Sequence, residues 1–211
     1  MWKLGVIKQV FLVLGLVGIL LFAAPSLALL FHGSGGEKFS ELYILGPGHM
    51  ADGYPFNVTT GSDYSVILGV ANHLGSSSYY DVQVKLRNST EMLPNATAGV
   101  SSPVPELRGF QVFAFDGQTW ESALTFRFSD VVLGVNVSHV GRITINNVTY
   151  DVNKSAVWDD ENSGYYYELF VELWVYDLSL SGFQFHNRFV GFSVTRKICP
   201  ALLRPPLVAL T

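Results

Sequence analysis

The sequence predicts an all-β fold, a β-sandwich of seven to nine short strands, preceded by one N-terminal transmembrane helix. Three observations lead to this prediction. Apolar and polar residues alternate with a period of two over much of the chain, helical periodicity is nearly absent there, and a charge-free apolar run lies near the N-terminus. With 49% apolar and 14% charged residues, the chain of 211 residues is too hydrophobic to be disordered.

The apolar run covers residues 10–31 and contains no charged side chain. At about 1.5 Å per residue, a helix of this length crosses a hydrocarbon core of roughly 30 Å. Lys3 and Lys8 precede it, so residues 1–9 are expected in the cytoplasm, with the bulk of the chain outside a cell membrane. A secretory signal peptide cleaved after Ala28 is the alternative, although the run is longer than a usual signal core. Both interpretations place the remainder outside the cytoplasm.

Six Asn-x-Ser/Thr triplets support that location, because they are acceptor sites for N-linked glycans in exported proteins. Their asparagines are Asn57, Asn88, Asn95, Asn136, Asn147 and Asn153. Cys199 is the only cysteine, so no intrachain disulfide can form, and the domain must rely on its core. The net charge of −4, without a Lys/Arg cluster, argues against a nucleic-acid partner.

Three segments follow the apolar run. Residues 32–38 are a Gly-rich linker, residues 39–197 are the predicted ectodomain, and residues 198–211 are an apolar tail interrupted by proline. Within the ectodomain, alternation bounded by turn residues predicts strands over residues 39–45, 64–71, 79–87, 110–115, 120–128, 143–145, 148–150, 165–178 and 183–195.

Local signals fix several of these elements. Alternation is cleanest over residues 79–87, which predicts one dry and one wet sheet face. Asp116-Gly117 predicts a tight turn, and residues 88–105 are polar and Pro-containing, as expected of a loop. Asn146-Asn147 predicts a two-residue hairpin that pairs Ile145 with Val148 and Ile143 with Tyr150. In the last strand the alternation changes near Asn187-Arg188, which predicts a bulge.

The first strands also carry a resemblance to a known family. It rests on Phe39–Pro47 (FSELYILGP), Tyr54-Pro55 with Asn57, Thr59 and Gly61, Gly69–His73 (GVANH) and Tyr80–Val84 (YDVQV). These segments resemble an archaeal membrane-protein family of unknown function, and more loosely the immunoglobulin-like adhesion modules of archaeal and bacterial surface proteins. The match is best over residues 39–87. It implies an archaeal envelope protein with an immunoglobulin-like ectodomain, and it implies no activity, cofactor or catalytic residue.

Residues able to do chemistry are scattered. No Gly-x-Ser-x-Gly elbow and no His-x-x-x-His pair occurs, so neither a serine hydrolase nor a common zinc site is indicated. The weak candidates for metal ligands are His49, Met50 and His73, as soft and imidazole donors, and Asp159, Asp160 and Glu161, as oxygen donors. Because neither set has the spacing of a dedicated site, we expect ordinary loop residues and no cofactor.

Aromatic residues in the 165–178 strand are the best candidates for a binding surface. Phe170 and Trp174, flanked by Glu168 and Glu172, predict a half-buried face that contacts either a partner protein or a carbohydrate. The candidate partner surface consists of Phe170, Trp174, Tyr176 and, in the tail, Leu202, Leu203 and Leu207.

The leading hypothesis is a non-catalytic, N-glycosylated β-sandwich anchored in lipid through residues 10–31. It would act as an accessory subunit of a membrane complex or as a cell-surface interaction module, with other protein subunits as partners. One alternative is an envelope enzyme or metal-binding domain that clusters the scattered His and acidic residues. Another is a secreted module of a surface layer or filament.

Overall fold

The structure is a computed structural model that describes residues 2–31 and 37–196. It separates into two compact units, Met1–Lys38 and Phe39–Thr211. Within α1 (Trp2–Phe31), side chains are described for residues 5–19 and for residue 22.

The helix α1 covers the predicted apolar segment over residues 10–31. Among the described residues, no helix qualifies as both long enough and apolar enough to cross a membrane. The predicted transmembrane helix is therefore corrected to a helix over Trp2–Phe31 without an assigned span.

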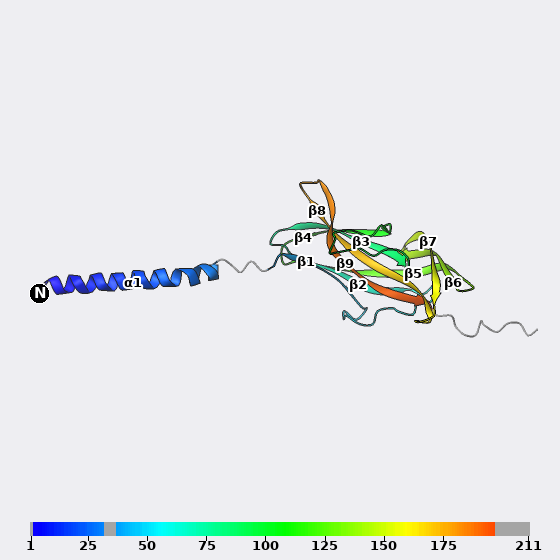
Figure 1. Cartoon of the computed structure of the whole chain (residues 1–211), viewed down its shortest axis with the longest axis horizontal. Helices are drawn as coiled ribbons and strands as arrows, with labels where there is room; N and C mark the ends of the chain where they lie inside the picture. The colour runs from blue at the N-terminus through cyan, green and yellow to red at the C-terminus, as the bar shows by residue number, and fades with distance from the viewer. Residues whose placement is uncertain (1, 32–36, 197–211) are drawn as a thin grey trace, which may run out of the picture. The chain divides into compact units, whose positions relative to one another are not determined.

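The second unit is all-β, as predicted. Its described part has nine strands, β1 (Phe39–Leu45), β2 (Tyr64–His73), β3 (Ser78–Asn88), β4 (Arg108–Ala114), β5 (Thr119–Gly134), β6 (Val137–Ile145), β7 (Val148–Asp159), β8 (Gly164–Asp177) and β9 (Gly182–Arg196). They form one hydrogen-bonded sheet in the order β1-β2-β5-β6-β7-β8-β3-β4, with β9 paired to β8 (Figure 1). All the strand pairings are antiparallel.

The sheet folds over a single apolar core. The two halves are joined where the end of β7 pairs briefly with the start of β8, through Trp158 and Asp159. Both halves contribute to the same buried cluster. Its members are alternate residues of β2, β5 and β6 in one half and of β3, β8 and β9 in the other. Two layers that share one core are compatible with the predicted β-sandwich.

Turn chemistry and register agree with the sequence in the places where local signals were strong. The hairpin pairs Ile145 with Val148 and Ile143 with Tyr150, and both residues of its turn, Asn146 and Asn147, have positive φ. In β9 the register shifts between the partners of Leu173 and Trp174, which confirms the predicted bulge, and Asn187 there has φ 55°.

The strands predicted from the sequence are shorter than β5, β6 and β7 in the structure. Asp130 in β5 has φ 52°, and Val140 and Arg142 in β6 flank a register shift, so the inward alternation changes phase in both strands. Gly141 lies opposite Asp130, where a Cβ atom would come within 3.0 Å of the Asp130 side chain. A pattern that changes phase no longer has a period of two, so residues 129–142 gave no strand signal.

Candidate functional site

Aromatic side chains gather on the outer face of four neighbouring strands, β4, β3, β8 and β9. The register places Phe113 opposite Tyr79 and Tyr176 opposite Phe183. The Tyr79 ring centroid lies 6.2 Å from that of Tyr176 and 5.3 Å from that of Phe183. The Tyr176 and Phe183 rings meet edge to face at 5.4 Å. These four residues form one continuous row across the four strands, because directly opposite residues on adjacent strands share a face.

A second pair of rings lies one row further along β8 and β9. Trp174 and Phe185 are cross-strand partners with ring centroids 6.0 Å apart. Phe113 is 57% exposed, and the other rings are half-buried. We call this surface the aromatic face; it consists of Tyr79, Phe113, Trp174, Tyr176, Phe183 and Phe185.

The aromatic face offers contact rather than chemistry. The residues that alternate with it on β3, such as Tyr80 and Val82, point into the core and are fully buried, so the strand keeps its aromatic rings outside. Polar groups border the rings: the Tyr79 hydroxyl donates to Oε1 of Gln111 over 2.5 Å. Rigid rings with hydrogen-bonding neighbours are typical of protein interfaces and of sugar-binding surfaces.

Part of the remaining outer face is covered. Residues 89–107 fold back over it, and Phe170 and Glu172 are completely buried. The prediction that Phe170 belongs to a partner surface is therefore wrong, and Glu172, expected beside a half-buried face, is also completely buried. The physical reason is that alternation shows which face a side chain occupies, whereas a loop distant in sequence decides whether that face meets water.

A buried ion pair holds residues 89–107 against this face. Nζ of Lys85 lies 2.8 Å from Oε2 of Glu172, and both side chains are nearly inaccessible. The loop closes around the pair, since the Ser102 backbone N–H donates to Oε1 of Glu172 over 2.7 Å and its carbonyl accepts from Lys85 over 3.3 Å. The Trp174 indole N–H also donates to Glu172, over 3.1 Å. The pair therefore links the covered part of the face to the aromatic face.

A second polar network, which the sequence did not predict, joins β1, β2, β3 and β9. Asn72 is fully buried and donates to the carbonyls of Ser76 and Ala114, while its Oδ1 accepts from the Tyr80 hydroxyl. The Tyr80 hydroxyl also lies 2.7 Å from Oγ of Ser40. The bonded residues are far apart in the sequence, 42 positions for Asn72 and Ala114 and 40 positions for Ser40 and Tyr80, so no local motif reveals them.

This network brings a serine and a histidine together: Nε2 of His186 lies 3.0 Å from Oγ of Ser40. Burial, with the positive charge of Arg188 as a second cause, lowers the pKa of His186. Ser40 is only 2% exposed, and in the described residues no carboxylate is hydrogen-bonded to the imidazole. Because a nucleophile needs access to substrate and a base oriented by a third group, the pair is a structural contact.

The predicted metal candidates do not converge. His73 pairs with Phe39, the first residue of β1, whereas His49 follows the last residue of that strand. Each histidine lies 3.7 Å from its own carboxylate, His73 from Glu41 and His49 from Glu121. Among residues 2–31 and 37–196, no three metal-binding side chains gather at one place.

The acidic candidates organise their own turn. Oδ1 of Asp159 accepts from the backbone N–H groups of Glu161 and Asn162, and these hydrogen bonds, with the one from the Asn162 side chain, lower its pKa. Asp160 and Glu161 are exposed, as is Met50 at 58%. Cys199, Leu202, Leu203 and Leu207 lie outside the described residues.

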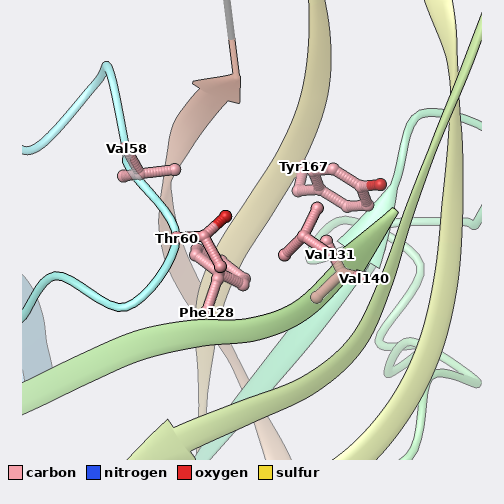
Figure 2. Close-up of a pocket in the computed structure, with 6 residues that line it drawn as sticks. All are labelled: Val58, Thr60, Phe128, Val131, Val140 and Tyr167. Atoms are coloured by element: carbon pink, nitrogen blue, oxygen red, sulfur yellow. The ribbon is translucent and has the colours of Figure 1, made fainter. Parts of the chain in front are cut away.

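Two cavities are too small for an organic ligand. The first has a volume of about 10 Å³, room for about one water molecule, and is lined by Val58, Thr60, Phe128, Val131, Val140 and Tyr167 (Figure 2). The second, of about 70 Å³, lies beside the ion pair of Arg87 and Glu168. Neither brings together an acid and a base in the arrangement that catalysis requires.

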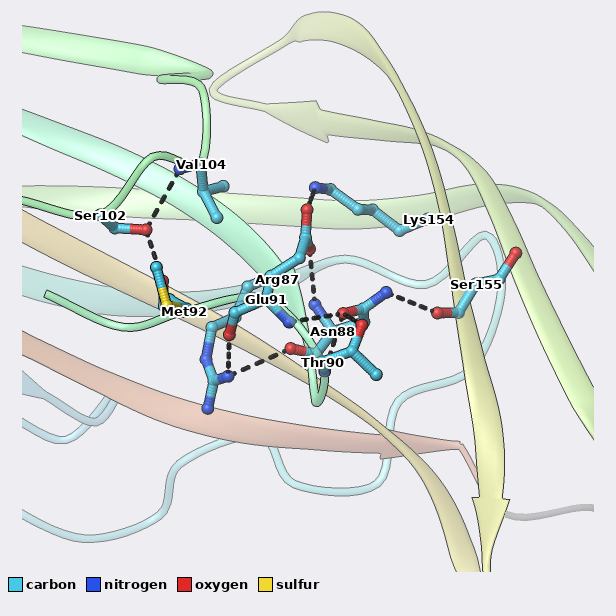
Figure 3. A network of polar contacts seen from close by, with 9 residues as sticks. All are labelled: Arg87, Asn88, Thr90, Glu91, Met92, Ser102, Val104, Lys154 and Ser155. Carbon is cyan, nitrogen blue, oxygen red and sulfur yellow. Dashed lines mark hydrogen bonds and ion pairs between the residues drawn. The ribbon is translucent and has the colours of Figure 1, made fainter.

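Five of the six candidate glycosylation asparagines are exposed, and Asn88 is half-buried. The Asn88 amide donates to the Ser155 carbonyl over 2.8 Å, and its Oδ1 accepts from the Thr90 and Glu91 backbone N–H groups (Figure 3). Glu91 in turn pairs with Lys154. Asn88 therefore serves as the anchor of the loop that follows β3.

The backbone conformation gives a second reason for asparagine at three of these positions. Asn136, Asn147 and Asn153 have φ of 58°, 66° and 46°. Asparagine tolerates this left-handed region better than most residues. The geometry therefore accounts for asparagine at these three positions whether or not a glycan is attached.

Comparison with known proteins gives a family match for the N-terminal part of the β-sheet unit. A family model described as DUF1616, a domain of unknown function, matches residues 33–137. No curated protein matches the chain. This confirms a domain of unknown function in the region where the resemblance was found. An archaeal origin and an immunoglobulin-like family remain predictions.

Solved structures with a similar shape include three of a β-glucosidase from Listeria innocua. The glucose complex has 15% identity and a TM-score of 0.39, and covers 76% of this chain and 16% of that one. The structure of the β-glucosidase alone has 14% sequence identity and a TM-score of 0.38, and the match covers 76% of this chain and 16% of that one. The gluconolactone complex has 14% sequence identity and a TM-score of 0.35, and the match covers 77% of this chain and 17% of that one. The chain thus spans about a sixth of the length of those proteins. What is established is that a DUF1616 domain, of unknown function, is found over residues 33–137.

Proposed function

We propose that the protein is a non-catalytic interaction module, an accessory subunit of a membrane complex or a cell-surface contact protein, that binds its partner through the aromatic face. The observation that carries this proposal is the row of Phe113, Tyr79, Tyr176 and Phe183, which stays at the surface although Phe170 and Glu172 on the same sheet face are completely buried. Large aromatic side chains supply most of the binding free energy in many protein interfaces.

The proposed location is a cell membrane, with the bulk of the chain extracytoplasmic. Three features of the sequence support it: the charge-free run over residues 10–31, the lysines Lys3 and Lys8 before it, and the six candidate glycosylation triplets after it. Five of the six asparagines are exposed, so glycans at those positions need no rearrangement of the fold. Carbonate extraction of cell membranes tests the attachment, and recovery of the chain in the soluble fraction would count against it.

The partner is tested by native purification in mild detergent, with identification of the chains that co-purify. Phe113→Ser removes an exposed ring of the aromatic face, and Val157→Ser, at 67% exposure on β7, is the matched control. We expect one defined partner chain with the wild type and the control. Phe113→Ser should weaken its binding by about tenfold, as for an interface anchor worth roughly 1.4 kcal/mol. A lone monomer, or equal retention by both variants, would contradict the proposal.

A further inference from the structure

The hairpin between β8 and β9 ends in an apolar turn that projects beyond the neighbouring strands (Figure 1). Leu178 is 87% exposed and Leu180 is 63% exposed. The turn is ordered by its own hydrogen bonds, since the backbone N–H and the hydroxyl of Ser179 donate to Oδ1 of Asp177 over 2.7 Å and 2.6 Å. We call residues 178–181 the leucine tip; solvent-facing turns usually carry polar residues at such positions.

Aromatic rings lie directly behind the leucine tip. Tyr176 and Phe183, the two residues that flank the hairpin end, are in edge-to-face contact, and Tyr79 packs on both. On the neighbouring strand edge, Phe113 and Phe115 meet edge to face at 5.3 Å, and Phe115 is 63% exposed. The two exposed leucines at the front of the hairpin are typical of apolar side chains that enter the interfacial layer of a bilayer, whereas the rings behind them belong to the aromatic face.

The ectodomain begins at this same end. Phe39 pairs with His73, and Ser40 contacts His186 in the strand that leads away from the leucine tip. Eight peptide steps separate Phe31, the last residue of α1, from Phe39, and they reach at most about 28 Å. If the N-terminal segment is held in a membrane, this end of the ectodomain cannot move far from the lipid surface.

Three of the candidate glycosylation sites, Asn57, Asn88 and Asn136, lie toward the other end. Asn57 bridges to Thr195 near the end of β9, Asn88 pairs with Tyr167, and Asn136 lies in the turn between β5 and β6. Asn147 and Asn153 lie on or beside β7, and Asn95 lies in the loop after β3. No such triplet occurs in residues 74–81, 111–119 or 174–185, which build the end with the leucine tip. A surface free of bulky hydrophilic glycans can approach lipid closely.

We propose that the leucine tip inserts into the interface of the bilayer that holds the N-terminal segment; this rests on the proposed membrane attachment. The charged residues of this end favour an uncharged headgroup layer. Asp177 lies in the hairpin itself, and residues 174–185 contain no Lys or Arg. Anionic lipids would be repelled there, so a zwitterionic surface is the expected binding partner.

The test uses the full chain reconstituted into phosphatidylcholine vesicles. An environment-sensitive fluorophore is attached at Ser179→Cys in a Cys199→Ser background, which keeps both leucines. The control carries the fluorophore at Val135→Cys, which replaces a 92% exposed side chain in the turn between β5 and β6. We expect blue-shifted emission and quenching by spin-labelled lipid at Ser179 and neither effect at Val135. Adding Leu178→Ser and Leu180→Ser should reduce the inserted population at least about tenfold.

The outcomes separate this proposal from the proposed function. If vesicles retain the chain but the Ser179 probe stays in water, the tip proposal is wrong and the attachment stands. If vesicles do not retain the chain, the attachment is wrong and the tip proposal falls with it. If the Ser179 probe shifts only after a co-purified partner chain is added, the tip docks on protein, which overturns the lipid assignment.

Discussion

The buried pair of Lys85 and Glu172 gives the sharpest test of the fold. In the variant Lys85→Met, the Glu172 carboxylate loses its only cation but keeps two donors, the Ser102 backbone N–H and the Trp174 indole. The loss of one partner of a buried pair costs about 3–5 kcal/mol. Because two donors remain, we expect about 3 kcal/mol, which lowers the midpoint of thermal unfolding by about 6–12 °C for a domain of this size.

The reciprocal variant should cost more. In Glu172→Met, the Lys85 ammonium keeps the Ser102 carbonyl at 3.3 Å, the Trp174 ring at 5.9 Å and the charge attraction of the Glu106 carboxylate, and two buried donors lose their acceptor. We expect about 4 kcal/mol. The double variant leaves no unpaired charge, so its cost should not exceed that of either single change. Simple addition would give about 7 kcal/mol, and the difference measures the coupling between the two side chains.

Urea denaturation of the purified chain, followed by tryptophan fluorescence, measures these free energies of unfolding. Arg127→Met is the matched control: it breaks the pair of Arg127 and Asp63, whose side chains are 44% and 65% exposed, and should leave the midpoint unchanged. Limited proteolysis adds a local readout, because release of Ser102 should expose residues 89–107 to cleavage. A loss below about 1 kcal/mol in both single variants, or additive losses in the double variant, would refute the reasoning.

Three further predictions concern the polar network and the candidate glycans. The pKa of His186 is lowered from 6.5 in the folded state, so as the pH falls the unfolded chain binds the proton first; stability is present above pH 6.5 and is lost below it. His186→Gln should therefore reduce the acid sensitivity of unfolding, and an unchanged pH profile would contradict this. Asn72→Leu removes the side-chain partner of the Ser76 and Ala114 carbonyls and of the Leu74 backbone N–H, leaves the Tyr80 hydroxyl with Ser40 alone, and should cost about 3 kcal/mol in urea denaturation; a loss near zero would show that water replaces these contacts. Peptide mapping of the native protein should find a glycan at the exposed Asn136 and none at Asn88, whose amide is bound to Ser155, and the reverse pattern would contradict the prediction.

Strong local signals predicted the ectodomain well. Alternation over residues 79–87 placed Val82 and Val84 in the core, and the Asn-Asn turn gave the correct pairing of Ile145 with Val148. Such signals need only neighbouring residues, because the pleat of a strand and the geometry of a two-residue turn are local properties. The strand signal failed where Asp130 takes a positive φ, since one residue in that conformation reverses the faces that follow.

The sequence by itself determined the all-β class, the turns, the bulge in β9 and the apolar segment before the ectodomain. Tertiary structure alone decided which outward side chains meet water. Phe170 and Trp174 have the same alternation, yet residues 89–107 bury the first and leave the second at the edge of an open surface. The physical reason is distance along the chain: Lys85 and Glu172 are 87 residues apart, and a contact of that kind leaves no periodic trace in either strand.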